Sequence, residues 1–195
     1  MEYSRFLSAY RLTKPFAGDP PALNDPPAVA GVLGLRLGVY NDGTYTLLAR
    51  PEAAYMTELA AGVFPVAAGR FTVFAADWMG RLFATDTSEL DGGDSATVTC
   101  FDLAEPSSFT TEANFHDFHN VVAVEQMDDL LNMNQYREWV ESGPSPGDGE
   151  RCVGYKVPLF LGGEDSVGNM ELADRSVYLH LMVEMFRSIG ASGSA

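Results

Sequence analysis

The residues best suited to chemistry in this chain are two histidines in the segment His116-Asp117-Phe118-His119. In a helix, their i, i+3 spacing would place both imidazoles on one side, as in a metal site or beside a catalytic carboxylate. A metal site needs further ligands, and none stands nearby in the sequence. Phe115 and Phe118 explain the same segment as a short helix that packs its rings inward. We therefore predict no metal here, and a small hydrolase that uses His116 or His119 stays open as an alternative.

The remaining reactive residue types occur in patterns that indicate structural roles. Neither Cys100 nor Cys152 has a histidine close in sequence, and we interpret both as small, partly buried apolar residues. The Gly-x-Ser-x-Gly pattern at Gly143 to Gly147 lies in a proline- and glycine-rich stretch that is typical of a flexible loop, and not in the strand-to-helix turn of a nucleophile elbow. Gly162 and Gly163 could cradle an anion, but two acidic residues follow them and would oppose a phosphate. The sequence therefore predicts no catalytic residue and no cofactor.

Carboxylates greatly outnumber cations in this sequence. The chain has 27 acidic and 12 basic residues, which gives a formal net charge of -15. A surface of this charge repels nucleic acid and anionic membranes, and it attracts a basic protein partner. The acidic proteome of a salt-adapted organism would produce the same charge without implying any partner, and this alternative stays open.

Two acidic clusters could contact a basic partner. One lies on a glycine-rich connection at 89–94, and the other on an expected helix over 121–141, where i, i+3 and i, i+4 spacing puts three carboxylates on one face. Like charges at this spacing destabilise a helix, and a basic partner would relieve that cost. A solvated face is the alternative interpretation. The candidate contacts are Glu89, Asp91, Asp94, Glu125, Asp128 and Asp129.

The elements that position these residues follow from hydrophobic periodicity and turn signals. Strands in the middle and helices at both ends predict an α+β fold, with a mixed, mostly antiparallel sheet and helices packed against it. Asp174 is expected to cap the last helix, which would bury a stripe from Val177 to Ile189 and end at Gly190. The expected helices span 2–12, 51–62, 112–119, 121–141 and 174–190, and the expected strands 45–48, 71–75, 81–85, 96–103 and 153–161.

The length of 195 residues suits a single domain over 1–195. Residues 1–37 are expected to form an N-terminal helix and a proline-rich connector, and 38–190 the core. No apolar run reaches the roughly 20 residues that a membrane span needs. The N-terminus lacks the basic start and apolar middle of a signal peptide, so we expect a cytoplasmic protein.

Two blocks of the sequence resemble a known family. The first runs from Val73 to Ala84, and the second from Tyr155 to Leu172 and on to Tyr178. Both resemble bacterial toxin-immunity proteins, specifically the type VI secretion immunity family with a GAD-like region, related in style to the SUKH superfamily. The resemblance covers roughly 38–190. The positions that it marks as fold-defining are Asp77, Trp78, Gly80, Arg81, Pro158, Gly162, Gly163, Asp165 and Asn169.

The resemblance implies a cytoplasmic, non-enzymatic protein that binds and neutralises a cognate secreted toxin. In the type VI branch the toxin is a DNase, whose cationic substrate cleft would suit an acidic inhibitor. We expect an immunity protein that occludes the active or substrate site of a basic nuclease, with no nucleic-acid or membrane partner. Besides the hydrolase, a SUKH-like regulatory or scaffold module that binds a cellular partner stays open.

Overall fold

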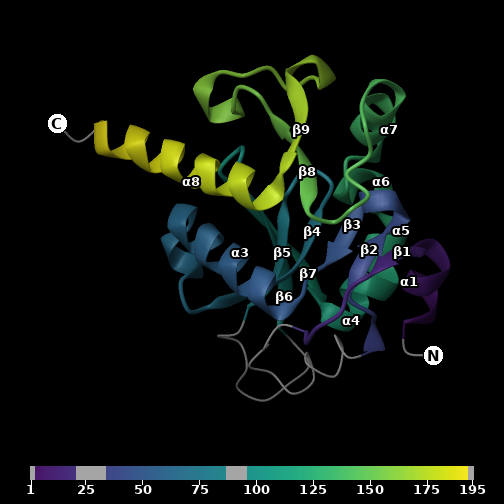
Figure 1. The fold of residues 1–195 in the computed structure, drawn as a ribbon. Helices are drawn as coiled ribbons and strands as arrows, with labels where there is room; N and C mark the ends of the chain where they lie inside the picture. The colour runs from purple at the N-terminus through teal and green to yellow at the C-terminus, as the bar shows by residue number, and fades with distance from the viewer. Residues whose placement is uncertain (1–2, 21–33, 87–95, 193–195) are drawn as a thin grey trace.

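A seven-stranded antiparallel meander forms the centre of the computed structural model, which describes residues 3–20, 34–86 and 96–192 (Figure 1). Each strand pairs with its neighbour in sequence, so no crossover connection is needed. Its strands are β1 (Leu12–Pro15), β2 (Gly38–Tyr40), β3 (Tyr45–Leu47), β4 (Phe71–Asp77), β5 (Leu82–Asp86), β6 (Thr97–Asp102) and β7 (Ser107–Asn114). A second antiparallel sheet joins β8 (Arg151–Tyr155) to β9 (Met170–Asp174).

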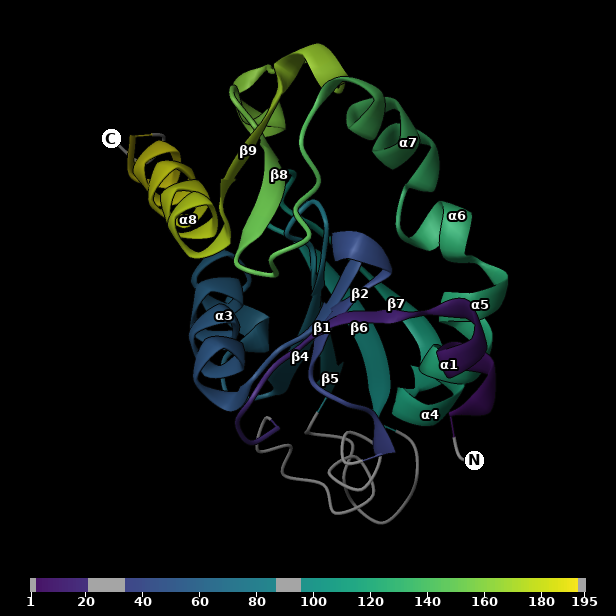
Figure 2. The ribbon, with the colours of Figure 1, turned by 45° about the vertical axis from the view of Figure 1, so that its right-hand side comes forward.

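Helices cover both faces of the meander. In Figure 2, α3 and α8 lie on one side of the sheet, and α1, α4 and α5 lie on the other. The α-helices are α1 (Ser4–Ala9), α3 (Arg50–Val63), α4 (Phe115–Asp117), α5 (Ala123–Glu125), α6 (Met127–Leu130), α7 (Met133–Ser142) and α8 (Arg175–Ser192), and η3 (Phe118–Val122) is a π-helical turn. The expected α+β class is confirmed, and every strand pairing of the described residues is antiparallel.

The central strands are buried and largely apolar because both of their faces are covered. All five residues of β5 are buried. Side chains alternate across a strand, so Leu82 and Ala84 enter one core while Phe83 enters the other. Asn41-Asp42-Gly43, a sequence that is typical of tight turns, forms the short 3-10 turn η1 between β2 and β3.

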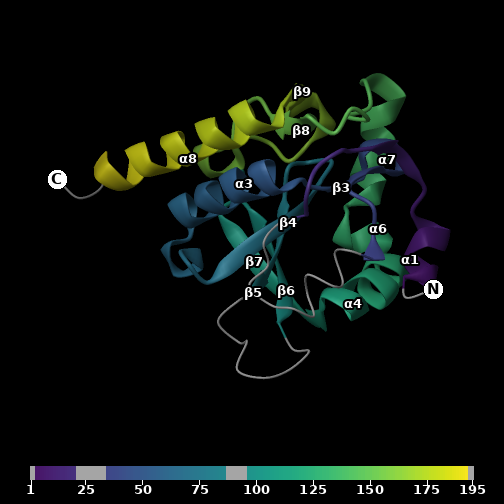
Figure 3. The same ribbon diagram turned by 60° about the horizontal axis from the view of Figure 1, so that its bottom comes forward.

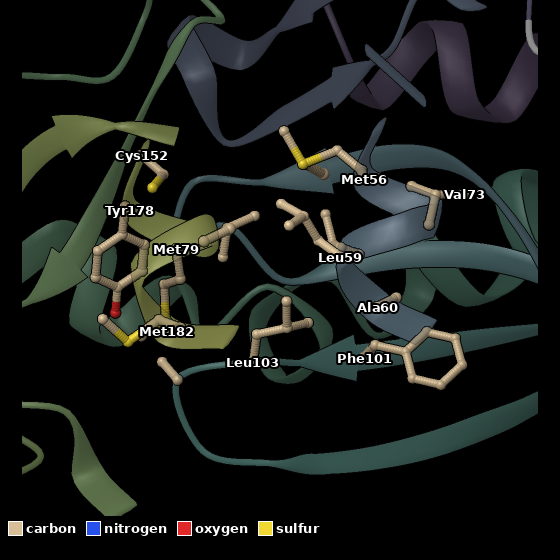
Figure 4. Packing of buried hydrophobic residues seen from close by; sticks show 14 of the residues in the cluster. Met56, Leu59, Ala60, Val73, Met79, Phe101, Leu103, Cys152, Tyr178 and Met182 are labelled. Atoms are coloured by element: carbon tan, nitrogen blue, oxygen red, sulfur yellow. The ribbon is translucent and has the colours of Figure 1, made fainter. Parts of the chain in front are cut away.

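The first core fills the space between the sheet, α3, α8 and β8. Figure 4 shows Met56 and Leu59 of α3 in this core with Phe101 of β6, Cys152 of β8 and Met182 of α8. Figure 3 shows α8 lying beside α3 with its C-terminal end extending past the body of the molecule. This core therefore joins the first half of the chain to the C-terminal helix.

The second core is rich in aromatic rings and lies under α1, α4 and α5. Phe6 of α1 stacks on Tyr10, with ring centroids 4.3 Å apart. Phe74 of β4 and Phe118 of η3 are fully enclosed in the same cluster. The expected N-terminal helix is thus confirmed as a shorter helix, α1, whose aromatic residues complete this core.

The expected helix over 121–141 is wrong as a single element. The backbone leaves helical geometry at Gln126 and again at Asn132, which has a left-handed φ of 50°. The chain consequently runs as α5, α6 and α7 in succession. Among the apolar side chains of this stretch, Leu131 and Trp139 are buried, while Val124 and Met127 are only partly buried.

Three other boundaries differ from the sequence expectation. Residues up to Asn114 belong to β7, so the helix expected from 112 begins at Phe115. The strand expected over 153–161 ends at Tyr155, and a 3-10 turn, η4 (Leu159–Leu161), follows. The helix α8 continues past Gly190 to Ser192. Near the N-terminus, the first residues of the expected connector form part of β1, and 21–27 lie outside the described residues.

Candidate functional site

The first of the two sequence blocks, Val73 to Ala84, contains a turn that joins the meander to α6 by hydrogen bonds. The buried carboxylate of Asp77 accepts hydrogen bonds from the backbone N–H groups of Met79 and Arg81 and from the Arg81 guanidinium. Arg81 also donates to the carbonyl oxygen of Leu130 at 2.8 Å. Burial alone would lower the pKa of Arg81, but the Asp77 carboxylate raises it above its ordinary value. Gly80 closes the turn with a φ of +84°.

Trp78 in the same turn contacts the residues at the start of α7. Its side chain is fully buried, and the indole N–H donates to the carbonyl oxygen of Leu131 at 2.6 Å. The ring also contacts Tyr136 of α7 edge-on. The Asp77–Arg81 turn therefore holds the broken helical segment against the sheet.

The second block is a loop closed by hydrogen bonds from Asn169. Its amide donates to the carbonyl oxygens of Val157 and Glu164 and accepts from the backbone N–H of Val157. Gly163 packs so closely that an added Cβ would lie 1.9 Å from the Val157 oxygen. Gly162 has a left-handed φ of +86° at the end of η4.

Pro158 and Asp165 complete this loop. The carbonyl oxygen of Pro158 accepts from the backbone N–H groups of Leu161 and Gly163. The Asp165 carboxylate accepts from the Tyr155 hydroxyl at 2.6 Å and from the Gln135 amide of α7 at 2.8 Å. The contacts of both family-like blocks are therefore with other parts of the same chain.

The two histidines have different surroundings and do not form a joint site. His119 is fully buried, and its Nδ1–H donates to the Phe115 carbonyl oxygen at 2.8 Å while Nε2 accepts from the Tyr45 hydroxyl at 3.0 Å. Burial lowers the pKa of His119 to about 3. His116 is half-exposed and contacts Asp117 and Asn120. The geometry gives His119 a packing role and leaves it no path to a substrate.

The other reactive groups are likewise enclosed. Burial raises the pKa of the Cys152 thiol to about 12 and raises that of Cys100 further, so neither forms a thiolate near neutral pH. Among the described residues, no three histidine, cysteine or acidic side chains converge as metal ligands.

The three candidate carboxylates on the expected helix do not share one face. Because the helix breaks at Gln126, Glu125 lies on α5, where it pairs with Arg5 of α1 at 2.7 Å. Asp128 on α6 pairs with Arg137 of α7 at 2.6 Å. Asp129 is exposed and makes no ion pair with a described residue. Glu89, Asp91 and Asp94 lie outside the described residues.

A groove beside the edge strand β7 was not expected from the sequence. It has a volume of about 400 Å³ and lies between β7 and the segment from η3 to α6. Its lining includes Phe109, Glu112, Val122, Gln126, Asp129 and Leu130. Of the candidate carboxylates that the structure describes, Asp129 alone belongs to this lining. The sequence of β7 is mostly polar, which is typical of an exposed strand, but the opposite wall of the groove comes from residues 10 or more positions further along the chain, from Val122 onward.

Most of the cationic side chains of this protein form contacts within the chain. Within the described residues, eight of the 12 cationic side chains form ion pairs with carboxylates, and three more donate to backbone carbonyl oxygens. Any partner therefore meets a surface whose accessible charge is dominated by carboxylates.

The comparisons with known proteins give information about the fold of this chain. No protein-family model and no curated protein matches the sequence. A crystal structure of Atu4351 from Agrobacterium tumefaciens is similar, with a TM-score of 0.64 and 15% sequence identity, over 93% of this chain and 88% of that chain. At this identity the similarity establishes the shared α+β architecture alone. None of the described helices has the length and apolar character that crossing a membrane requires.

Proposed function

We propose that this protein is an immunity protein that binds a cationic bacterial toxin, a nuclease, and occludes its active or substrate site. The proposal depends on the distribution of charge. The net charge is -15, and among the described residues eight of the 12 cationic side chains already pair with carboxylates of this chain. A nuclease must attract phosphate, so its substrate cleft is cationic. An inhibitor with this charge imitates the electrostatics of the substrate.

The rigid scaffold supports an inhibitor rather than a catalyst. The sheet is packed on both faces, and the family-like blocks are tied by hydrogen bonds to α6, α7 and the β8–β9 loop. A surface that is preorganised in this way loses little conformational entropy when it binds. In the proposal the protein acts in the cytoplasm of the producing cell, where it needs no cofactor and contacts neither nucleic acid nor membrane.

Complementary charge has a measurable consequence for binding. Electrostatic steering raises association rates from roughly 10⁵–10⁶ to as much as 10⁸–10⁹ M⁻¹s⁻¹ at low salt. We expect the association rate with the toxin to fall steeply between 50 mM and 500 mM salt, while the dissociation rate changes little. Exposed ion pairs such as Arg5–Glu125 hold their carboxylates weakly, because such pairs contribute only about 0–1 kcal/mol. These carboxylates can therefore exchange partners on binding.

The test is co-expression with the product of an adjacent toxin gene. Cells that express the toxin alone should stop growing, and cells that also express this protein should grow. The purified pair, with the toxin catalytically inactivated, should form a complex by calorimetry. Unrestored growth together with no complex at micromolar concentration would refute the proposal. A complex with a harmless cellular protein instead would favour the scaffold alternative.

A further inference from the structure

The two edges of the seven-stranded sheet differ in a way that matters for binding. The edge strand β1 has four residues and contains Lys14 and Pro15, and lysine and proline both discourage further strand pairing. The opposite edge, β7, has eight residues and contains neither. Within the described residues, β7 pairs only with β6. One edge is therefore protected by its sequence, and the other is available to a further strand.

The surface next to β7 offers apolar contact as well as backbone groups. Phe109 in the middle of the strand is 47% exposed, which is unusual for a phenylalanine in a sheet. Val122 of η3 and Leu130 of α6 line the opposite wall of the groove. Leu130 is already buried, but Phe109 is exposed and Val122 is partly exposed, so an extended segment lying against β7 would cover these two side chains and gain from their burial.

The charged groups of the groove have a single sign. Glu112 on β7 and Asp129 on α6 both line it, both are exposed, and neither forms an ion pair with a described residue. Among the residues that the structure describes, no lysine or arginine lines the groove. A segment that combines a lysine or arginine with an apolar side chain is therefore complementary to this groove in charge and polarity.

The backbone of β7 is distorted beside the groove. Glu112 has a left-handed φ of 56°, which a non-glycine residue adopts at a cost of about 1 kcal/mol or more. The pairing of β7 with β6 is irregular there: Thr99 pairs with Thr110, and the next pair is Thr97 with Asn114. A bulge of this kind ends regular pairing and redirects a side chain. Here it accompanies the placement of the Glu112 carboxylate in the groove.

We propose that β7 and this groove bind an extended basic segment of the toxin as an additional strand of the sheet. The inference rests on the proposed function and identifies the surface of this protein that would contact the toxin. The toxin main chain would hydrogen bond to the free edge of β7, an apolar side chain would rest on Phe109 and Val122, and a lysine or arginine would meet Glu112 and Asp129. Main-chain bonds supply affinity in such strand additions, and the side-chain contacts supply specificity.

The variants that test this inference change the groove without touching a core. Asp129→Lys reverses one groove charge, and Phe109→Ser removes the exposed ring. Each should weaken binding of the purified, catalytically inactivated product of the adjacent toxin gene by about tenfold or more. Glu138→Lys on the exposed face of α7 is the matched control, because it makes the same change in net charge outside the groove. Its affinity should remain within about threefold of the parent at 150 mM salt.

Hydrogen exchange on the parent protein provides a readout that needs no variant. Amides of β7 should exchange at least tenfold more slowly in the complex, and those of β1 should not change. If the toxin binds all variants equally and β7 gains no protection, the groove inference is wrong while the proposed function stands. If the toxin does not bind the parent protein, the proposed function fails and the inference fails with it. Unchanged melting temperatures of the variants would exclude misfolding as the cause of weak binding.

Discussion

Lowering the pH should destabilise this protein through one buried side chain, His119. The imidazole is enclosed by the rings of the second core and hydrogen bonds to the Phe115 carbonyl and the Tyr45 hydroxyl. Protonation would place a charge in this core and would turn Nε2 from an acceptor into a donor. Burial accordingly lowers the pKa of His119 from 6.5 to about 3. The folded protein thus keeps this histidine neutral over a range in which the unfolded chain takes up a proton.

The sign and size of the effect follow from proton linkage. Above pH 6.5 neither state binds the proton, so His119 does not affect the pH dependence of stability. Below pH 6.5 the unfolded state is protonated first, and the free energy of unfolding falls by about 1.4 kcal/mol per pH unit until the pH approaches 3. At pH 5 the loss amounts to about 2 kcal/mol relative to pH 7.5.

Urea unfolding of the parent protein and of His119→Gln isolates this contribution. Glutamine can keep both hydrogen bonds but does not titrate. The free energy of unfolding of the parent, minus that of the variant, should therefore fall by about 2 kcal/mol between pH 7.5 and pH 5. The fluorescence of the buried Trp78 and Trp139 reports unfolding. His116→Gln, at the half-exposed histidine of the same segment, is the control. A parent-minus-variant difference that stays constant over this pH range would contradict the burial argument.

Three further sets of substitutions test the packing of the fold. Asp77→Asn leaves the Arg81 guanidinium without its carboxylate and should cost about 3–5 kcal/mol in urea unfolding, and Asp77→Asn with Arg81→Met should recover part of it. Gly163→Ala adds a Cβ 1.9 Å from a carbonyl oxygen and should cost about 1–3 kcal/mol, seen as a lower melting temperature. Leu179→Ala should cost about 2–5 kcal/mol, whereas Leu181→Ala on the exposed side of α8 should cost under about 0.5 kcal/mol. Equal losses at positions 179 and 181 would contradict the orientation of α8.

The local elements were largely predictable from the sequence. The strands of 71–86 and the turn between them follow from apolar runs separated by Asp77 and Gly80, and the structure places β4 and β5 there. Asp174 was expected to cap the last helix, and its carboxylate accepts from the N–H of Val177 at 2.9 Å. These features depend on residues close in sequence, whose steric and hydrogen-bonding preferences act over one turn.

The buried face of α8 was only partly predictable. The expected stripe included Val177, Leu181 and Ile189, and these three side chains are exposed. The helix is rotated because the Tyr178 ring lies against Gly154 of β8, where an added Cβ would approach within 2.3 Å. Leu179 and Val183 enter the first core instead. A helix with apolar residues on more than half of its circumference has two possible faces, and the partner strand selects one.

The sequence alone determined the charge of this protein, the α+β class and the positions of most turns. Only the tertiary structure decided which charges are available and where a partner could lie. Glu125 is paired by Arg5, which is 120 positions away, and the break at Gln126 separates Glu125 from Asp128 and Asp129, which a continuous helix would have grouped with it. The groove joins β7 to α6 across the fold. Periodicity reports contacts over a few residues, whereas a surface is assembled from segments that meet only when the chain has folded.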